Sequence, residues 1–257
     1  MDEFGPLLIE KVRAAAKARP ARSRRLAERI RLRTPEPGRP EPTRRRVERA
    51  APAPRRPLRP VSAPSREGVV LVGCSTGGPP ALDALLRPLP ADFPWPVVVA
   101  QHMPAGFTGP LAARLDRCCA IAFGVATGPT PLRPGHAHIG RGDADLILTR
   151  RGGTLTALPA PSSPDHHWHP SVDRLVRSAL GLCAPNALVG VLMTGMGDDG
   201  VAAMTELKHA GGRTIAEAEE TAVVWGMPGE LVRAGGAEIV APLDEIAARL
   251  LDLVTSS

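Results

Sequence analysis

The sequence predicts an α/β fold: a doubly wound, mostly parallel sheet with helices on both faces and a small antiparallel hairpin excursion. Two observations carry this prediction. From Gly68 onward, short apolar runs without polar alternation are each followed by a stretch of helical periodicity, which is typical of parallel strands buried on both faces. In the middle of the chain this alternation stops, and Gly152-Gly153 joins two further short runs in the manner of a hairpin.

The expected elements follow one another in three groups along the chain. The first group has strands at Val69–Gly73, Val97–Ala100 and Ala120–Val125 and helices over Pro79–Leu86 and Pro110–Cys118. The antiparallel excursion comprises the runs His136–Ile139, Leu146–Thr149 and Thr154–Ala157. The last group begins with a helix that is capped by Ser171 and ends at Leu182. It continues with strands at Ala187–Thr194, Arg213–Ala218 and Glu238–Val240, which alternate with helices over Val201–Ala210, Pro228–Ala234 and Asp244–Val254.

Charge and proline divide the chain into a basic tail, residues 1–67, and a domain, residues 68–257. The tail holds 19 Lys+Arg against 8 Asp+Glu and 11 of the 29 prolines, whereas the domain holds 13 basic against 18 acidic residues. Such a tail has too few large apolar residues to offset its ordering entropy. We predict a largely disordered Pro/Arg-rich linker, with a short helix over Leu7–Ala18 and a weak one over Ser23–Leu32.

Composition also limits which cellular compartment and which binding partners we expect. The four cysteines form no CxxC pair, there is no signal peptide, and no apolar run reaches membrane-spanning length, so we expect a cytoplasmic protein without a transmembrane segment. Aromatic residues make up 3% and tyrosine is absent. We therefore expect no sequence-specific nucleic-acid recognition. The tail's net charge of +11 predicts only weak, salt-sensitive contact with anionic surfaces.

Three glycine-flanked segments each follow the carboxyl end of a predicted strand, the edge where open parallel sheets bind ligands. They contain Ser75 in Gly73-Cys74-Ser75-Thr76-Gly77-Gly78, His102 in Gln101-His102-Met103-Pro104, and Asp199 in Thr194-Gly195-Met196-Gly197-Asp198-Asp199-Gly200. A serine on a tight strand-to-helix turn, a histidine base and an orienting carboxylate meet the needs of an activated hydroxyl nucleophile. Together they predict a serine hydrolase.

Each segment also has a plainer interpretation. Ser75 alone fits a helix-capping turn, and a lone histidine is more often structural. The third segment has the spacing GxGxxG with Glu219 downstream, as in dinucleotide-binding folds. Two aspartates at a phosphate-facing turn would repel pyrophosphate, however, and the motif follows a late strand.

Residues 68–257 resemble the catalytic domain of the chemotaxis-receptor methylesterases, the CheB-type protein-glutamate methylesterases. The resemblance rests on the three segments above and on further blocks in the same order along the chain. These are Ala105-Gly106-Phe107-Thr108, Pro134-Gly135-His136-Ala137-His138-Ile139, His169-Pro170-Ser171-Val172-Asp173 and Trp225-Gly226-Met227-Pro228.

The resemblance implies a Ser-His-Asp triad of Ser75, His102 and Asp199, rather than Asp198, with Thr76 and Met196 beside the oxyanion. It implies hydrolysis of γ-glutamyl methyl esters on the cytoplasmic helices of methylated chemotaxis receptors, giving glutamate and methanol, and related enzymes also deamidate particular glutamines. No cofactor and no metal are expected. Family members usually carry an N-terminal receiver domain. Residues 1–67 lack its apolar strands and acidic cluster, so the sequence gives no support to control by phosphorylation in cis.

Two other functions stay open from the sequence alone. One is a catalytically inactive module that binds receptor tails, and the other is an anionic-surface binder that acts through the Arg-rich tail. His166, His167 and His169 with Asp165 could suggest a metal site, but they lie in a proline-bounded loop without Cys or Glu at ligand spacing. A peptide-contacting or solvated loop is the favoured interpretation.

Overall fold

The computed structural model describes residues 68–255, and every element below lies in that range. The basic tail 1–67 and residues 256–257 lie outside the described residues, and with them the helices predicted over Leu7–Ala18 and Ser23–Leu32 and the predicted linker. Within the described range, no helix is long and apolar enough to cross a membrane.

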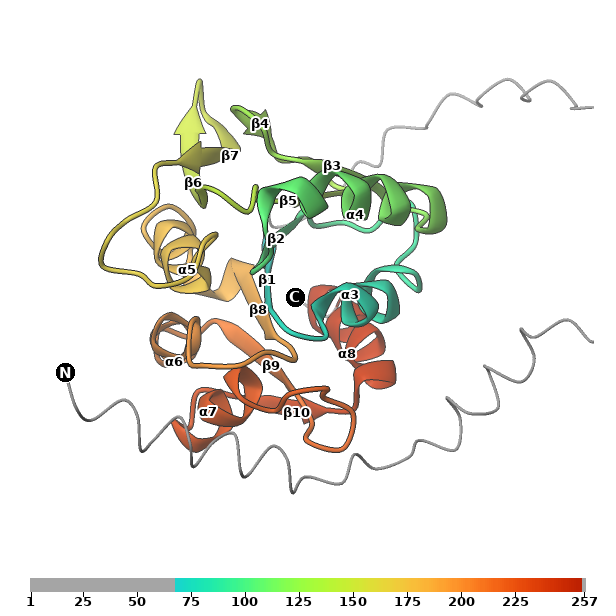
Figure 1. Ribbon diagram of the computed structural model, residues 1–257, viewed down its shortest axis with the longest axis vertical. Helices are drawn as coiled ribbons and strands as arrows, with labels where there is room; N and C mark the ends of the chain where they lie inside the picture. The colour runs from blue at the N-terminus through green and yellow to red at the C-terminus, as the bar shows by residue number, and fades with distance from the viewer. Residues whose placement is uncertain (1–67, 256–257) are drawn as a thin grey trace, which may run out of the picture. The chain divides into compact units, whose positions relative to one another are not determined.

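A seven-stranded sheet, in which every neighbouring pair is parallel, forms the centre of the domain (Figure 1). Its strand order is β10-β9-β8-β1-β2-β5-β3. The strands are β1 (Val69–Cys74), β2 (Val97–Gln101), β3 (Ala122–Val125), β5 (His136–Ile139), β8 (Leu188–Leu192), β9 (Arg213–Glu217) and β10 (Ile239–Ala241). The strands β1, β2 and β8 are buried at every position, as expected for strands covered on both faces.

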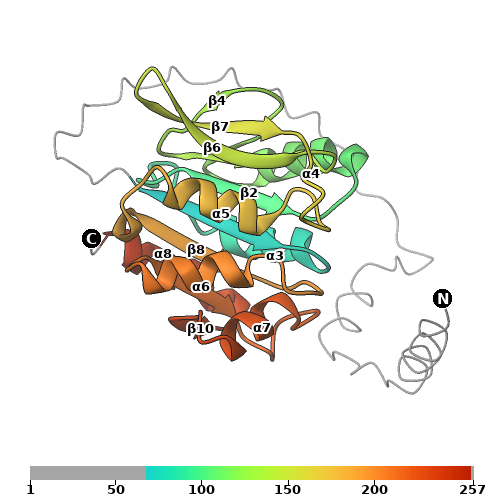
Figure 2. The same cartoon turned by 90° about the vertical axis from the view of Figure 1, so that its left-hand side faces the viewer.

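Helices cover both faces of this sheet, which confirms the doubly wound prediction (Figures 1 and 2). Alternate residues of β1 point to opposite faces. Val70 and Val72 pack with one group of helices, and Leu71 packs with the other. The first group is α3 (Gly78–Leu86), α4 (Ala105–Cys118) and α8 (Leu243–Thr255), and the second is α5 (Val172–Leu180), α6 (Val201–His209) and α7 (Met227–Arg233).

The antiparallel excursion is a separate three-stranded sheet in the order β4-β7-β6, beside α5 (Figure 2). It consists of β4 (Thr130–Pro131), β6 (Asp145–Arg151) and β7 (Thr154–Ala160). The predicted hairpin turn at Gly152-Gly153 is confirmed, since both glycines have positive φ, at 55° and 81°.

Two details of the prediction were wrong. The run His136–Ile139 was assigned to the excursion, but it forms β5 and pairs in parallel with β2 and β3 in the main sheet. Its neighbours in space come from elsewhere in the chain, so local sequence gave no sign of this pairing. The helix expected to start at Pro110 starts at Ala105, and Pro110 lies inside α4 at the loss of one helical hydrogen bond.

The strand order places the functional segments together. The strand β1 lies between β2, which follows it in the chain, and β8, which arrives much later. The connections therefore leave β1 in two directions, and such a switch point opens a crevice at the carboxyl ends of the strands. Ser75, His102 and the segment 194–200 follow the carboxyl ends of β1, β2 and β8 respectively.

Candidate active site

The chain turns sharply after β1, which presents Ser75 at the edge of the sheet. The Ser75 amide donates to the carbonyl of Thr194 (2.9 Å), and the Ser75 carbonyl accepts from the amide of Gly78 at the start of α3 (2.8 Å). Gly77, between them, has a φ of 85°, which a side chain would strain. Gly195 lies so close that an added Cβ would stand 2.7 Å from that of Ser75. The turn therefore depends on glycine in both segments.

His102 is held in place by the main chain and by a buried glutamine. Its amide donates to the carbonyl of Cys74 (3.0 Å). The Gln101 side chain donates from Nε2 to the carbonyls of Ser75 (3.0 Å) and His102 (2.9 Å), and its Oε1 accepts from the Cys74 thiol (3.1 Å). One amide thus ties the serine segment to the histidine segment. Cys74 is a packed strand residue, as expected, and burial is the main cause that raises the pKa of its thiol.

Asp199 lies behind His102 and accepts four hydrogen bonds. Its Oδ2 accepts from His102 Nε2 (2.8 Å) and the Val172 amide (2.7 Å), and its Oδ1 accepts from the Ser171 hydroxyl (2.9 Å) and the Asp173 amide (3.2 Å). Burial by itself would raise the pKa of Asp199, but the hydrogen bonds from His102 and Val172 outweigh it and the pKa is lowered. Asp199 is therefore an ionised acceptor.

This ionised carboxylate fixes the tautomer of His102. Because a carboxylate can only accept, Nε2 must carry the proton, and Nδ1 is left as the acceptor. Nδ1 is buried and has no hydrogen-bond partner among the described residues. Trp168 stacks on the ring, with centroids 5.5 Å apart and planes 11° apart, which adds a further restraint on its orientation.

Ser75 and His102 line one cavity of about 390 Å³. Its other walls come from Thr76, Met103, Pro104, Gly142, Trp168, His169 and Met196. No hydrogen bond from the amides of Thr76 or Met196 is found in the described part of the chain, so both are free to donate to a ligand. Four of the five predicted site residues line this cavity, and the fifth, Asp199, reaches it through its hydrogen bond to His102. Asp198 is exposed and, with the other side of Asp199, lines a neighbouring groove.

A second Asp–His pair, which the sequence did not reveal, borders the same cavity. His169 Nδ1 lies 2.9 Å from Oδ1 of Asp145, the fully buried first residue of β6. Asp145 also accepts from the amides of Ser171 (2.8 Å) and Ser163 (3.2 Å) and pairs with Arg174. Burial alone would raise the pKa of Asp145, and the hydrogen bonds, that of His169 foremost, lower it.

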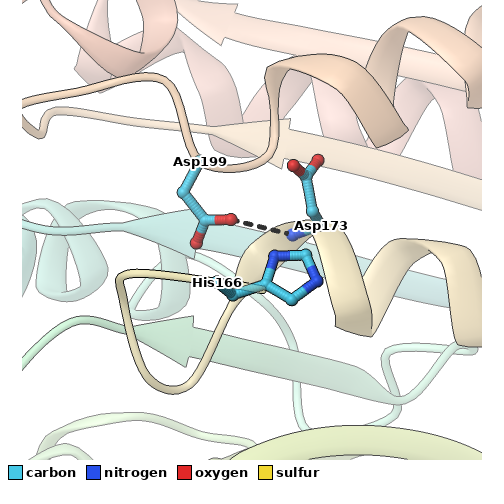
Figure 3. A group of neighbouring side chains, drawn as sticks. All are labelled: His166, Asp173 and Asp199. Atoms are coloured by element: carbon cyan, nitrogen blue, oxygen red, sulfur yellow. Dashed lines mark hydrogen bonds between the residues drawn. The ribbon is translucent and has the colours of Figure 1, made fainter. Parts of the chain in front are cut away.

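The histidine-rich loop does not gather its residues as one cluster. His169 pairs with Asp145, while the ligand atoms of His166, Asp173 and Asp199 lie within 4.8 Å of one another (Figure 3). In this group the Asp199 carboxylate is already occupied by its four donors, and Asp173 caps α6 by accepting from the Ala203 amide (2.8 Å). A cation here would have to displace those bonds.

A buried glutamate lies beneath the serine turn, and the sequence analysis missed its place in the site. Glu217 accepts from the Thr194 amide (2.8 Å) and the Thr221 hydroxyl (3.2 Å), and burial raises its pKa. Thr194 in turn donates its hydroxyl to the carbonyl of Thr76 (2.8 Å) and accepts the Ser75 amide. Glu217 ends β9, so its proximity depends on strand order, which a local motif cannot show.

A family model described as CheB methylesterase matches residues 70–250, which include both Asp–His pairs and the serine turn. The chain belongs to the CheB methylesterase family. In fold, it is similar to the crystal structure of the Thermotoga maritima CheB methylesterase catalytic domain, with a TM-score of 0.70 and 37% identity. That likeness covers 73% of this chain and 98% of the Thermotoga chain. The resemblance inferred from the motifs is thereby confirmed.

Two curated relatives in the family are similar over nearly the whole chain. A protein-glutamate methylesterase/protein-glutamine glutaminase 2 of Rhodopseudomonas palustris is 53% identical over 98% of this chain. A protein-glutamate methylesterase/protein-glutamine glutaminase 3 of Rhodospirillum rubrum is 47% identical over 95% of it. The matches span 67% and 63% of the lengths of these two relatives, or about two thirds.

Proposed function

We propose that the chain is a serine esterase that hydrolyses γ-glutamyl methyl esters of chemotaxis receptors to glutamate and methanol. The observation that carries the proposal is the buried His102–Asp199 hydrogen bond at the wall of the cavity that Ser75 also lines. Two relatives bear the names of both activities, methylesterase and glutaminase. Deamidation of receptor glutamines would use the same cavity and the same groups.

In the acylation step the Ser75 hydroxyl attacks the ester carbonyl while His102 Nδ1 accepts the hydroxyl proton. The imidazolium that forms keeps its Nε2 proton in the bond to Asp199, whose negative charge stabilises it. The amides of Thr76 and Met196 donate to the developing oxyanion. His102 then returns the proton to the departing methoxide, and methanol leaves an acyl-Ser75 ester.

In the second step water replaces the alcohol. His102 Nδ1 accepts a proton from the water as the water oxygen attacks the acyl carbon, and the proton returns to the Ser75 oxygen as the acyl bond breaks. The product is the γ-carboxylate of glutamate. With a glutamine substrate the leaving group of the first step is ammonia, and the second step is the same.

The proposed partners are the methylated helices of receptor cytoplasmic domains, and the proposed location is the cytoplasm. The exposed side chains of Trp168 and Met196 (42% and 62%) border the cavity and offer apolar contacts to an approaching helix. Weak contact of the basic tail with anionic surfaces remains part of the proposal and concerns residues outside the described range.

The decisive experiment is methanol release from a receptor peptide that carries a γ-glutamyl methyl ester, with the Ser75→Ala variant alongside the unchanged chain. Loss of the nucleophile is expected to lower turnover by about 10⁶. Ser162→Ala, an exposed serine outside the cavity, is the matched control and is expected to keep full activity. Methanol release by a folded Ser75→Ala variant near the normal rate would contradict the mechanism.

A further inference from the structure

His169 presents a hydrogen-bond acceptor to the cavity. Asp145 is ionised, since it pairs with Arg174 and accepts two backbone amides besides His169. A carboxylate can only accept, so His169 Nδ1 carries a proton and donates it to Asp145. In the neutral ring the other nitrogen, Nε2, then has a lone pair and no proton.

That nitrogen is free and accessible. The described part of the chain provides no hydrogen bond to His169 Nε2, and this atom is not among the buried side-chain atoms that lack a partner. The ring lines the same cavity as Ser75 and His102, and its side chain is 24% exposed. The Asp145 side chain has no exposed surface and is held by its neighbours. Because Asp145 in turn holds His169 Nδ1, the lone pair of His169 Nε2 has a fixed direction.

We propose that the Asp145–His169 pair is a specificity device that favours a carboxamide over a methyl ester in the Ser75 cavity. The inference rests on the proposed function and deepens it. A glutamine carboxamide has two N–H donors on its leaving nitrogen, whereas a methyl ester has no donor at all. His169 Nε2 accepts from the amide N–H and orients the group, and it gains nothing equivalent from the ester.

Both substrates share the remaining interactions. Their carbonyl oxygens reach the same backbone amides, and their carbonyl carbons face the same serine. A site built to accept a hydrogen bond discriminates strongly between a ligand that donates one and a ligand that does not. His169 is thus a positioning residue for amide substrates and takes no proton from Ser75.

The test compares two synthetic peptides of one receptor sequence, with either glutamine or glutamate γ-methyl ester at one position. The kcat/KM for ammonia release is divided by that for methanol release. His169→Asn keeps a side-chain N–H at the position of Nδ1 for Asp145 and removes the acceptor in the cavity. It is expected to lower the amide-to-ester ratio on the order of tenfold, the range of one to two net hydrogen bonds.

Three further variants make the comparison specific. His169→Gln carries an amide oxygen to the position of Nε2 and should restore part of the ratio. His169→Phe also removes the acceptor and serves if His169→Asn fails to fold in a thermal unfolding assay. His136→Asn, on β5 and outside the cavity lining, should leave the ratio as it is.

The outcomes separate the inference from the proposed function. Equal loss of both activities in the His169 variants, or an unchanged ratio, would overturn the inference and leave the esterase proposal standing. Methanol release without any ammonia release by the unchanged chain would do the same. Failure to release either product would overturn both.

Discussion

Two regions of the molecule each place the histidine of an Asp–His pair in the wall of one cavity. One region is the carboxyl edge of the parallel sheet, and the other is the small antiparallel sheet with the loop that follows it. The first region supplies His102 with Asp199, and the second supplies His169 with Asp145. The start of α5 joins them, since the Ser171 amide donates to Asp145 and the Ser171 hydroxyl to Asp199. The same two residue types therefore occur twice in one network, with different consequences.

The difference lies in what neutralises each carboxylate. Asp145 pairs with the Arg174 guanidinium, so its charge is compensated before His169 is considered. Among the described residues, the ion-pair partner of Asp199 is His102, and its other donors are a hydroxyl and two amides. The charge of Asp199 is thus available to stabilise an imidazolium. In the proposed mechanism the His102–Asp199 pair therefore serves proton transfer, whereas the His169–Asp145 pair fixes the orientation of the His169 ring.

The largest expected effect tests the first pair against its neighbour in sequence. Asp199→Asn should lower kcat for ester hydrolysis by roughly 10⁴, because it removes the charge and favours the wrong tautomer of His102. Asp198→Asn, at the exposed adjacent position, is the matched control and should retain most of the activity. The measurement is methanol release at saturating ester peptide. Losses of equal size, or a greater loss at Asp198, would show that the carboxylate is misassigned.

The sequence predicts the His102–Asp199 pair but not the His169–Asp145 pair. Ser75, His102 and Asp199 each follow an apolar strand in a glycine-rich segment, so strand periodicity was enough to bring them to one edge. Asp145 opens an antiparallel strand, and His169 lies 24 positions away in a loop without periodicity. Their contact depends on how the small sheet packs against α5. Glu217 was missed for a related reason, because its contact with Thr194 requires β8 and β9 to be neighbours.

An effect of intermediate size is expected on stability, and it tests the His169–Asp145 pair. Asp145→Asn removes a fully buried charge from Arg174 and His169 and should lower the free energy of unfolding by roughly 3 kcal/mol. Asp143→Asn breaks the exposed Arg141 pair nearby and should cost only about 0–1 kcal/mol. Urea unfolding at pH 7 measures both. A loss at Asp145 no larger than that at Asp143 would contradict the structural importance of this pair.

The pH dependence of stability, compared between the unchanged chain and Asp145→Asn, sharpens this result. Asp145 has a folded pKa below its ordinary value, so its contribution to stability is present above the unfolded pKa of about 3.9 and is lost as pH falls through the folded value. Stability of the unchanged chain should therefore fall more steeply on acidification below about pH 5 than that of Asp145→Asn. Contributions from Asp199 and Glu217 are common to both proteins. Parallel curves over this range would argue against the lowered pKa.

The smallest expected effect is that of changing the Met196 side chain, because the proposed contribution of this residue comes from its backbone. Its side chain is 62% exposed and its amide has no partner in the described structure, so the amide is the proposed oxyanion donor. Met196→Leu keeps the amide and should change kcat/KM by about twofold at most, the scale of an ordinary surface substitution. Replacing residue 196 by the corresponding α-hydroxy acid removes the N–H and should lower kcat by about 10²–10³. A hundredfold loss in Met196→Leu, which keeps the amide, would show that the side chain rather than the amide carries the contribution of this residue.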